Sequence, residues 1–528
     1  MTEEFKYGGS ATNQKTVLGH PSGLFVLFFT EMWERFSYYG MRALLVLFLT
    51  KSLLEDGWGW ERADALVLYG WYTGLVYLTP IFGGLIADKL LGYRKAIVLG
   101  AFVMTLGHAS MALEVVAQPF FYVGLLCLII GNGLFKPNIS SIVGQLYKNQ
   151  GKEKDAGYTI FYMGINAGAF LGILLCGYIG ENIGWHYGFG LAGIFMFLGM
   201  LQFYFAQGIF GRIGLDKNNT EAYDNDNFSQ RNVDMVEKPV EAENKKVASD
   251  RIKVISIFAL FTVFFWWAFE QAGGSMTIFA DDYTQRALSG SAATTFKVIN
   301  TVITLVPMVV ITWVLLLLFK QTFAKFALSN IWLGLSFIII WGIVIWMVLR
   351  EFKVTSTEVP ASWFSVLNSL FIILFAPLFS KLWESKYNPS GPVKFAIGLF
   401  LVGIGFAVLS FGANSIPEGA QTASVSLMFL VFAYLFHTLG ELCVSPVGLS
   451  YVSKLAPVKL VGMMFGIWFV SNFLANLLGG FTGSFIDPIS EKYGLSSFFL
   501  IFTVIPILAG LVMLALNGTL KRWMHGIH

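Results

Sequence analysis

The sequence is poor in charge and nearly free of cysteine. Asp, Glu, Lys and Arg make up only 13% of its 528 residues, and its three cysteines, Cys127, Cys176 and Cys443, all lie inside apolar runs. Cysteines placed in this way argue against a disulfide framework and against a cysteine metal cluster. The net charge of +3 is spread over many loops and no basic aromatic patch is present, so we expect no nucleic-acid partner.

Apolar residues are abundant instead. The chain is 56% hydrophobic and 16% aromatic, with a mean hydropathy of +0.66. These values lie far outside the averages of soluble proteins. The first twenty residues are polar, and the apolar run after them is too long for a signal peptide. We therefore expect an all-α, multi-pass protein of the lipid bilayer.

Apolar runs long enough to span a bilayer predict fourteen helices. They cover about 22–50, 64–87, 95–116, 119–147, 156–181, 185–210, 252–282, 295–319, 326–349, 362–383, 393–412, 425–454, 460–484 and 494–518. The polar stretch 211–251 predicts a flexible linker. We expect a terminal segment at 1–21, a six-helix half at 22–210, a second half at 252–518 with two extra helices at about 295–349, and a tail at 519–528.

Basic residues predict the orientation in the membrane. Lys89, Arg94 and Lys95 follow the second span, and further bases follow every second span after it, whereas the loops at 114–119, 181–185 and 412–424 hold almost none. Because bases accumulate on the cytoplasmic side, we expect both termini and the linker to be cytoplasmic, in a cell membrane (the inner or plasma membrane).

A weak internal repeat supports two related halves. The stretch from Thr79-Pro-Ile-Phe corresponds in place to Phe375-Ala-Pro-Leu-Phe, and Phe135-Lys-Pro137 to Val444-Ser-Pro446. A proline inside a helix removes a backbone hydrogen bond and favours a bend. The two halves would share these bends.

The first span carries four charges at membrane depth. At about 100° per residue, Glu31, Glu34, Arg35, Tyr38 and Arg42 fall within an arc of roughly 100°. Each charge costs at least about 2.5–3.5 kcal/mol against lipid, so this stripe needs protein or water around it. Two interpretations stay open: a structural set of ion pairs that orients the helix, or a charged transport pathway.

Other deep polar residues are few. Lys136 requires a carboxylate or water, and the acids of the first span are natural partners. Glu441 has no base nearby in sequence, so it either holds a proton with a backbone partner or binds the amino group of a substrate. We expect His437 to be a packing residue. Asn166 lies among Gly164, Gly168 and Gly172, whose spacing is typical of a close-packing face, and its amide needs a partner.

Two motifs resemble those of a known family. Glu31-Met-Trp-Glu-Arg-Phe-Ser-Tyr-Tyr-Gly40 resembles the first-helix signature of the proton-dependent oligopeptide transporters, within the major facilitator superfamily. The stretch from Gly83 to Lys95, Gly-x-x-x-Ala-Asp-x-x-x-Gly-x-Arg-Lys, is similar to the loop typical of major facilitators. The resemblance implies a major facilitator fold with two six-helix halves and two extra helices.

The resemblance also implies a site. It assigns proton coupling to Glu31, Glu34, Arg35 and Lys136, and an outer gate to Arg42 with Glu270. The substrate-binding residues that it implies are Arg35, Arg42, Tyr38, Tyr39, Tyr77, Lys136, Tyr162, Asn166, Trp266, Asn368, Glu441, Ser445 and Trp468. Three departures stand out. Gly70 occupies the position of a histidine in animal members, the extra helices do not lie between the halves, and the residues around Asn368 differ from the family pattern, which leaves the orientation of Asn368 open.

The expected function is proton-coupled import of di- and tripeptides. The charges of a dipeptide zwitterion lie about 5–7 Å apart. Bases in one half and Glu441 in the other would suit two charges at that distance. A proton is the coupling ion; no other cofactor and no metal are expected, and one copy should suffice. A channel would need a continuous polar pore, but the deep charges lie in only a few spans. An enzyme would need a nucleophile with its base or a metal-ligand set, and neither the histidines nor the cysteines provide one. The closest alternative is a proton-coupled carrier of another small anion or zwitterion, nitrate-like or amino-acid-like.

Overall fold

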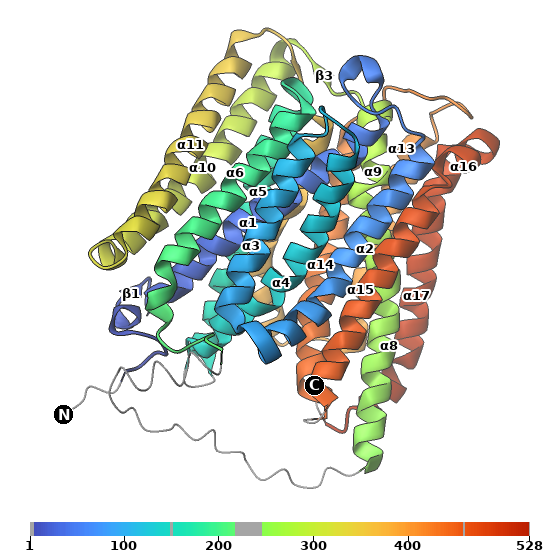
Figure 1. Ribbon diagram of the computed structural model, residues 1–528. Coiled ribbons are helices and arrows are strands. Elements are labelled where there is room, and N and C mark those ends of the chain that lie inside the picture. The colour runs from blue at the N-terminus through green and yellow to red at the C-terminus, as the bar shows by residue number, and fades with distance from the viewer. Residues whose placement is uncertain (1–4, 148–150, 217–244, 458–459, 527–528) are drawn as a thin grey trace. The chain divides into compact units, whose positions relative to one another are not determined.

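The computed structural model describes residues 5–147, 151–216, 245–457 and 460–526 (Figure 1). Long helices make up most of this part of the chain, which confirms the predicted all-α membrane protein. Most of the predicted linker, residues 217–244, lies outside the described residues. The chain divides into two compact units.

The first unit comprises Met1–Phe48, Thr79–Phe228 and Arg286–Val366. Its helices are α1 (Ser22–Thr50), the later part of α2 (Arg62–Ile86) with the π-helical turn η3 (Ala87–Leu91), α3 (Tyr93–Ala112), α4 (Pro119–Gln145), α5 (Lys152–Asn182), α6 (Trp185–Ala206) with η4 (Gln207–Phe210), α10 (Gly290–Thr322) and α11 (Ala327–Lys353). The short strands β3 (Ala287–Leu288), before α10, and β4 (Thr357–Glu358), after α11, pair antiparallel, and η7 (Ala361–Ser365) follows.

The second unit comprises Leu49–Leu78, Ser229–Gln285 and Leu367–His528, so that α2 is divided between the units. It contains the turn η2 (Leu53–Glu55) and α8 (Lys245–Phe269), which continues through η5 (Glu270–Gly273), α9 (Ser275–Ile278) and η6 (Phe279–Tyr283). The remaining helices are α12 (Val366–Glu384), α13 (Gly391–Ala413), α14 (Met428–Leu455), α15 (Val461–Gly483), α16 (Ile486–Tyr493) and α17 (Leu495–Trp523).

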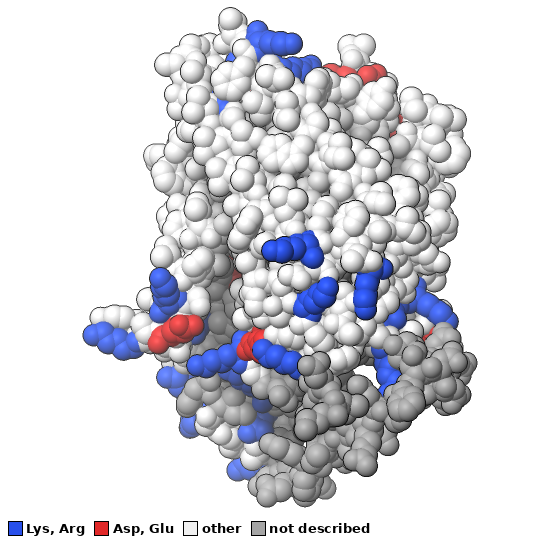
Figure 2. Space-filling view, turned by 90° about the vertical axis from the view of Figure 1, so that its left-hand side faces the viewer, with Lys and Arg blue, Asp and Glu red and all other residues white. Residues whose placement is uncertain are grey.

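The membrane spans agree with the sequence-based expectation. Thirteen helices of the described residues are long and apolar enough to cross a membrane. Helix α1, with 29 residues, is the remaining one of the fourteen predicted spans, and its four charged residues lie in its middle part, between residues 31 and 42. Figure 2 shows a broad stretch of surface almost free of charged side chains, with basic side chains gathered toward one end of that face. The sequence did not predict the short α16 or the paired strands. The orientation in the membrane and the limits of the halves stay predictions.

Helix α5 fixes α1 by close contact. A Cβ added at Gly168 would lie 2.1 Å from the Met32 carbonyl oxygen, and one at Gly172 would lie 2.2 Å from that of Phe36. Only glycine permits such an approach of two helix backbones. The predicted close-packing face is therefore real, and its partner is the helix that carries the charged stripe.

The first described residues fold against the ends of α4 and α5. After η1 (Ala11–Gln14), β1 (Thr16–Val17) pairs with β2 (His20–Pro21). The Tyr7 hydroxyl donates to Glu153 Oε1 at 2.5 Å, and His20 Nδ1 lies 2.8 Å from the Tyr147 hydroxyl. Burial, followed by the bond to Glu153, raises the pKa of Tyr7, and burial lowers that of His20. Turns of this kind depend on side-chain contacts, which periodicity does not show.

Candidate functional site

In the first unit, α1 buries an acid–base–acid group. Glu31, Glu34 and Arg35 are 0–3% exposed as side chains. Arg35 Nε donates to Glu34 Oε2 and lies 3.1 Å from Glu31 Oε1. The spacing of three and four residues puts all three side chains on neighbouring positions of one helix face. One guanidinium therefore serves two carboxylates.

The amide of Asn132, on α4, completes this group. Asn132 Nδ2 donates to Glu34 Oε1 at 2.9 Å, and its side chain is 1% exposed. Sequence reasoning missed Asn132. A signal was present, because it lies between Gly131 and Gly133, an arrangement like that which singled out Asn166. Within the described residues, Glu31 Oε2 and Arg35 Nη2 have no hydrogen-bond partner, so both retain bonding capacity.

The remaining predicted residues of this unit lie on α1, α4 and α5. Lys136, on α4, interacts electrostatically with Glu31. The Arg35 guanidinium carbon lies 5.4 Å from the Tyr38 ring centroid, and that of Arg42 lies 5.9 Å from the Tyr39 ring centroid. These distances are in the range of cation–π contacts. The bases of α1 are thus lined by aromatic rings.

On α5, Tyr162 and Asn166 stand one turn apart. Asn166 Nδ2 donates to the Tyr162 carbonyl oxygen at 3.0 Å, while the Tyr162 side chain is 41% exposed. The amide nitrogen therefore finds a partner in its own helix.

In the second unit, Glu441 is the centre of a different cluster. Asn368 Nδ2, on α12, donates to Glu441 Oε2 at 2.8 Å and reaches Thr438 Oγ1 at 3.1 Å. Among the residues that the structure describes, no Lys or Arg forms an ion pair with Glu441. The orientation of Asn368, open from sequence, is toward the acid.

The other predicted residues of this unit lie on α14, α15, α8 and α2. Ser445 follows it by one turn of α14, with its hydroxyl buried and without a hydrogen-bond partner in the described part of the chain. Trp468, on α15, packs so closely on α14 that a Cβ added at Gly448 would lie 2.1 Å from its ring. Trp266, on α8, contacts Phe265 and Phe269. Tyr77 belongs to this unit as well.

Glu270 begins η5, where α8 ends. Its side chain is buried, and it interacts with Glu441 as a like charge. Its predicted gate partner Arg42 belongs to the first unit, so the pairing of Arg42 with Glu270 stays a prediction. His437 lies with its ring centroid 4.5 Å from that of Phe406 and 6.3 Å from that of Phe269, as a packing residue would.

A third polar cluster, which sequence reasoning missed, lies in the second unit around Arg62. Its guanidinium forms ion pairs with Asp282 at 2.7 Å and Asp487 at 2.8 Å, and it also donates to the Tyr283 hydroxyl at 3.0 Å. These residues come from α2, η6 and α16, which lie far apart in the sequence. No local pattern could join them.

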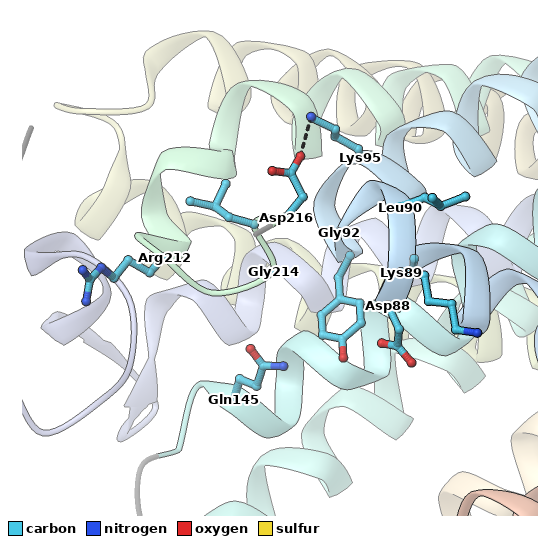
Figure 3. A pocket seen from close by; sticks show the side chains of 12 residues that line it. Asp88, Lys89, Leu90, Gly92, Lys95, Gln145, Arg212, Gly214 and Asp216 are labelled. Atoms are coloured by element: carbon cyan, nitrogen blue, oxygen red, sulfur yellow. Dashed lines mark hydrogen bonds and ion pairs between the residues drawn. The ribbon is translucent and has the colours of Figure 1, made fainter. Parts of the chain in front are cut away.

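A polar pocket of about 550 Å³ lies elsewhere in the first unit (Figure 3). Its walls come from η3, the start of α3, the end of α4 and residues 212–216, and Lys95 Nζ pairs with Asp216 Oδ2 across 2.6 Å. None of the predicted binding or coupling residues lines it. We therefore do not assign the substrate to this pocket.

Comparisons with known proteins show which family the chain resembles. A sequence profile of the POT family matches residues 94–228 and 335–499. The chain is 31% identical to the peptide transporter YePEPT of Yersinia enterocolitica, over 97% of this chain and 96% of the relative. It is also 31% identical to a di-/tripeptide transporter of Lactococcus lactis subsp. cremoris, over 97% and 98% of the two chains.

The fold is similar to a crystal structure of the peptide transporter POT in complex with sulfate. The TM-score is 0.73 at 29% identity, with 97% of each chain covered. This similarity confirms the predicted major facilitator fold. Together with the profile and the relatives, it shows that the chain belongs to the POT family.

Proposed function

We propose that the chain is a proton-coupled symporter that imports di- and tripeptides by alternating access. The observation that carries this proposal is the contrast between two buried acidic clusters. In one, a base is shared by two acids; in the other, an acid has amide and hydroxyl neighbours but forms no ion pair with a base among the described residues. The relatives with 31% identity, which are named as peptide transporters, support the peptide as substrate.

Recognition would rest on the two termini of the peptide. The carboxylate binds the bases Arg35, Arg42 and Lys136, and the amino group binds Glu441, which Asn368 orients. Ser445 and Asn166 offer further hydrogen bonds. The side chains face the aromatic residues Tyr38, Tyr39, Tyr77, Tyr162, Trp266 and Trp468. Because aromatic surfaces accept many shapes, the specificity should be broad.

The shared base provides a means of coupling. When Glu31 or Glu34 takes up a proton, Arg35 loses one of its two anionic partners and becomes available to the peptide carboxylate. Proton and peptide then stabilise the same loaded state. A membrane potential adds about 2.3 kcal/mol per charge per 100 mV, enough for roughly fiftyfold accumulation. Arg42 and Glu270 would close the outer gate.

The cellular setting is part of the same proposal. The carrier works as a monomer in the cell membrane, with both termini cytoplasmic, and needs only the proton as cofactor. It binds no nucleic acid and catalyses no reaction.

The experiment that tests the proposal is uptake of labelled dialanine into proteoliposomes, with and without an inward proton gradient. We expect gradient-driven accumulation above equilibrium that tripeptides inhibit and free alanine does not. Absence of dialanine uptake in both conditions would contradict it. Labelled nitrate and free amino acids, tested in parallel, would then identify the alternative small anion or zwitterion.

A further inference from the structure

The helices α10 and α11 have no place in a fold of two six-helix halves, and they carry no predicted site residue. In Figure 1 they run side by side next to α6. Both belong to the first compact unit, together with α1, α5 and α6. The contacts of α11 show which helices of this unit it stabilises.

One contact links α11 to α1 through a buried glutamine of α6. Ser329 Oγ, on α11, donates to the Gln202 carbonyl oxygen at 2.7 Å. The Gln202 side chain then bonds α1 twice, because its Nε2 donates to the Val26 carbonyl oxygen at 3.2 Å and its Oε1 accepts from Thr30 Oγ1 at 2.8 Å. The beginning of α11 is thus tied to the beginning of α1.

A second contact is direct. The Phe337 ring, on α11, lies 5.7 Å from the Phe29 ring and 5.7 Å from the Trp33 ring, centroid to centroid, both in edge contact. Trp33 also stacks on Phe195 of α6 at 4.7 Å. Phe29 and Trp33 are fully buried, and Phe337 is 5% exposed. Phe337 of α11 and Phe195 of α6 therefore form an aromatic wall against which Trp33 of α1 packs.

This wall lies behind the coupling group. At about 100° per residue, Trp33 stands roughly 160° around α1 from both Glu31 and Arg35 and about 100° from Glu34. The rotation of α1 that packs Trp33 is thus the rotation that presents the acids and the base. Helices in lipid gain no hydrophobic free energy by associating, so packing of this kind decides how they sit.

The far end of α11 is anchored to α5. Glu351 Oε1 accepts from the Tyr178 hydroxyl at 2.7 Å, and Glu351 Oε2 accepts from Thr357 Oγ1 at 2.6 Å. The Trp346 ring contacts Tyr178 edge-on at 6.1 Å. With one end on α6 and the other on α5, α11 cannot slide or turn freely along the first unit.

We propose that the α10–α11 hairpin is a buttress for α1 and that Phe337 is a positioning residue for Glu31, Glu34 and Arg35. The inference rests on the proposed proton coupling for its functional consequence, but not for its structural one. Without Phe337, α1 loses the ring contacts that fix its rotation, and the acids exchange partners less selectively.

The test compares Phe337→Ala with its neighbour Ile338→Ala, whose side chain is 71% exposed and lies away from α1. Both variants remove apolar atoms from α11, but only one removes atoms from the wall. We expect gradient-driven dialanine uptake to fall about tenfold in Phe337→Ala, with peptide exchange in the absence of a gradient within about twofold. Ile338→Ala should behave like the wild type, and Phe337→Leu should recover most of the lost rate.

Amide hydrogen exchange of residues 29–36 provides a readout that does not depend on transport. We expect faster exchange there in Phe337→Ala than in Ile338→Ala, because local opening follows lost packing. Two outcomes would overturn the buttress. One is wild-type protection from hydrogen exchange together with wild-type driven uptake in Phe337→Ala. The other is an equal loss of driven peptide uptake and of peptide exchange in that variant. If the wild type shows no proton-driven uptake, the proposed function fails, and the hydrogen exchange still tests the buttress.

The whole hairpin can also be removed at a defined place. Ala287 pairs with Glu358, and Val359 N donates to the Arg286 carbonyl oxygen at 3.0 Å, so the chain enters and leaves the hairpin side by side. A two-residue Asn-Gly turn in place of residues 289–356 would close the gap. We expect this shortened chain to exchange peptides and to lose driven accumulation. Driven accumulation at the wild-type level would contradict the proposal.

Discussion

The two acidic clusters solve the same problem of a carboxylate at membrane depth in different ways. In the first unit, Glu31 and Glu34 share Arg35, three residues of a single helix. In the second, Glu441 lies near Asn368 and Thr438, with no base in an ion pair in the described part of the chain. The first cluster contains its own base, Arg35, whereas no base of the described residues forms an ion pair with Glu441 in the second.

This difference separates two tasks. A carboxylate that competes with another for one base responds to protonation by releasing that base, which suits coupling. A carboxylate oriented by an amide keeps a place for a cation, which suits recognition of an amino group. Four predictions test this division, from the largest expected effect to the smallest.

Glu34→Gln should have the largest effect. The substitution keeps an acceptor for Asn132 but removes one of the two carboxylates that share Arg35. We expect gradient-driven accumulation to fall at least about a hundredfold while exchange survives. Glu418→Gln, at an exposed acid, is the control. Intact pH-driven accumulation in Glu34→Gln would remove the coupling role from this cluster.

Glu441→Gln should act on recognition. Loss of the charge should raise the KM for dialanine about tenfold or more, and leave the KM for an N-acetylated dipeptide, which has no amino charge, unchanged. Uptake competition between the two ligands measures the ratio. If both KM values rise equally, Glu441 does not bind the amino group, and the contrast between the clusters is lost.

The two amides form a matched pair. Asn132→Ala removes the bond to Glu34, and Asn368→Ala the bond to Glu441. A hydrogen bond to a charged group contributes about 1.5–3 kcal/mol, so each effect should be at least about tenfold. Asn132→Ala should shift the pH profile of driven uptake, and Asn368→Ala should raise the KM. Uptake measured over pH 5–8 checks both variants. A raised KM in Asn132→Ala and a shifted pH profile in Asn368→Ala would mean that the two clusters have the opposite roles.

His437→Phe should have the smallest effect. The ring lies one turn before Glu441 but packs on Phe406 and Phe269. Replacement of one aromatic ring by another of similar size should leave uptake within about twofold and its pH dependence unchanged. A shifted pH profile would make His437 a titrating partner of the second cluster.

The sequence by itself determined the features that repeat along one helix. The spans, the prolines inside α2, α4, α12 and α14, the charged stripe and the glycine face all follow from spacing, because residues three or four apart share a face of the same helix. The ion pair of Arg35 with Glu31, four residues away, is of this local kind.

Only the tertiary structure decided which helices supply the partners. The bond of Asn132 to Glu34, that of Asn368 to Glu441, the ion pairs of Arg62 and the packing of Phe337 on α1 join residues 73 to 425 positions apart or on separate helices. No periodicity reports such pairs. Any apolar face can pack against several others in lipid, and the shapes of the side chains choose among them.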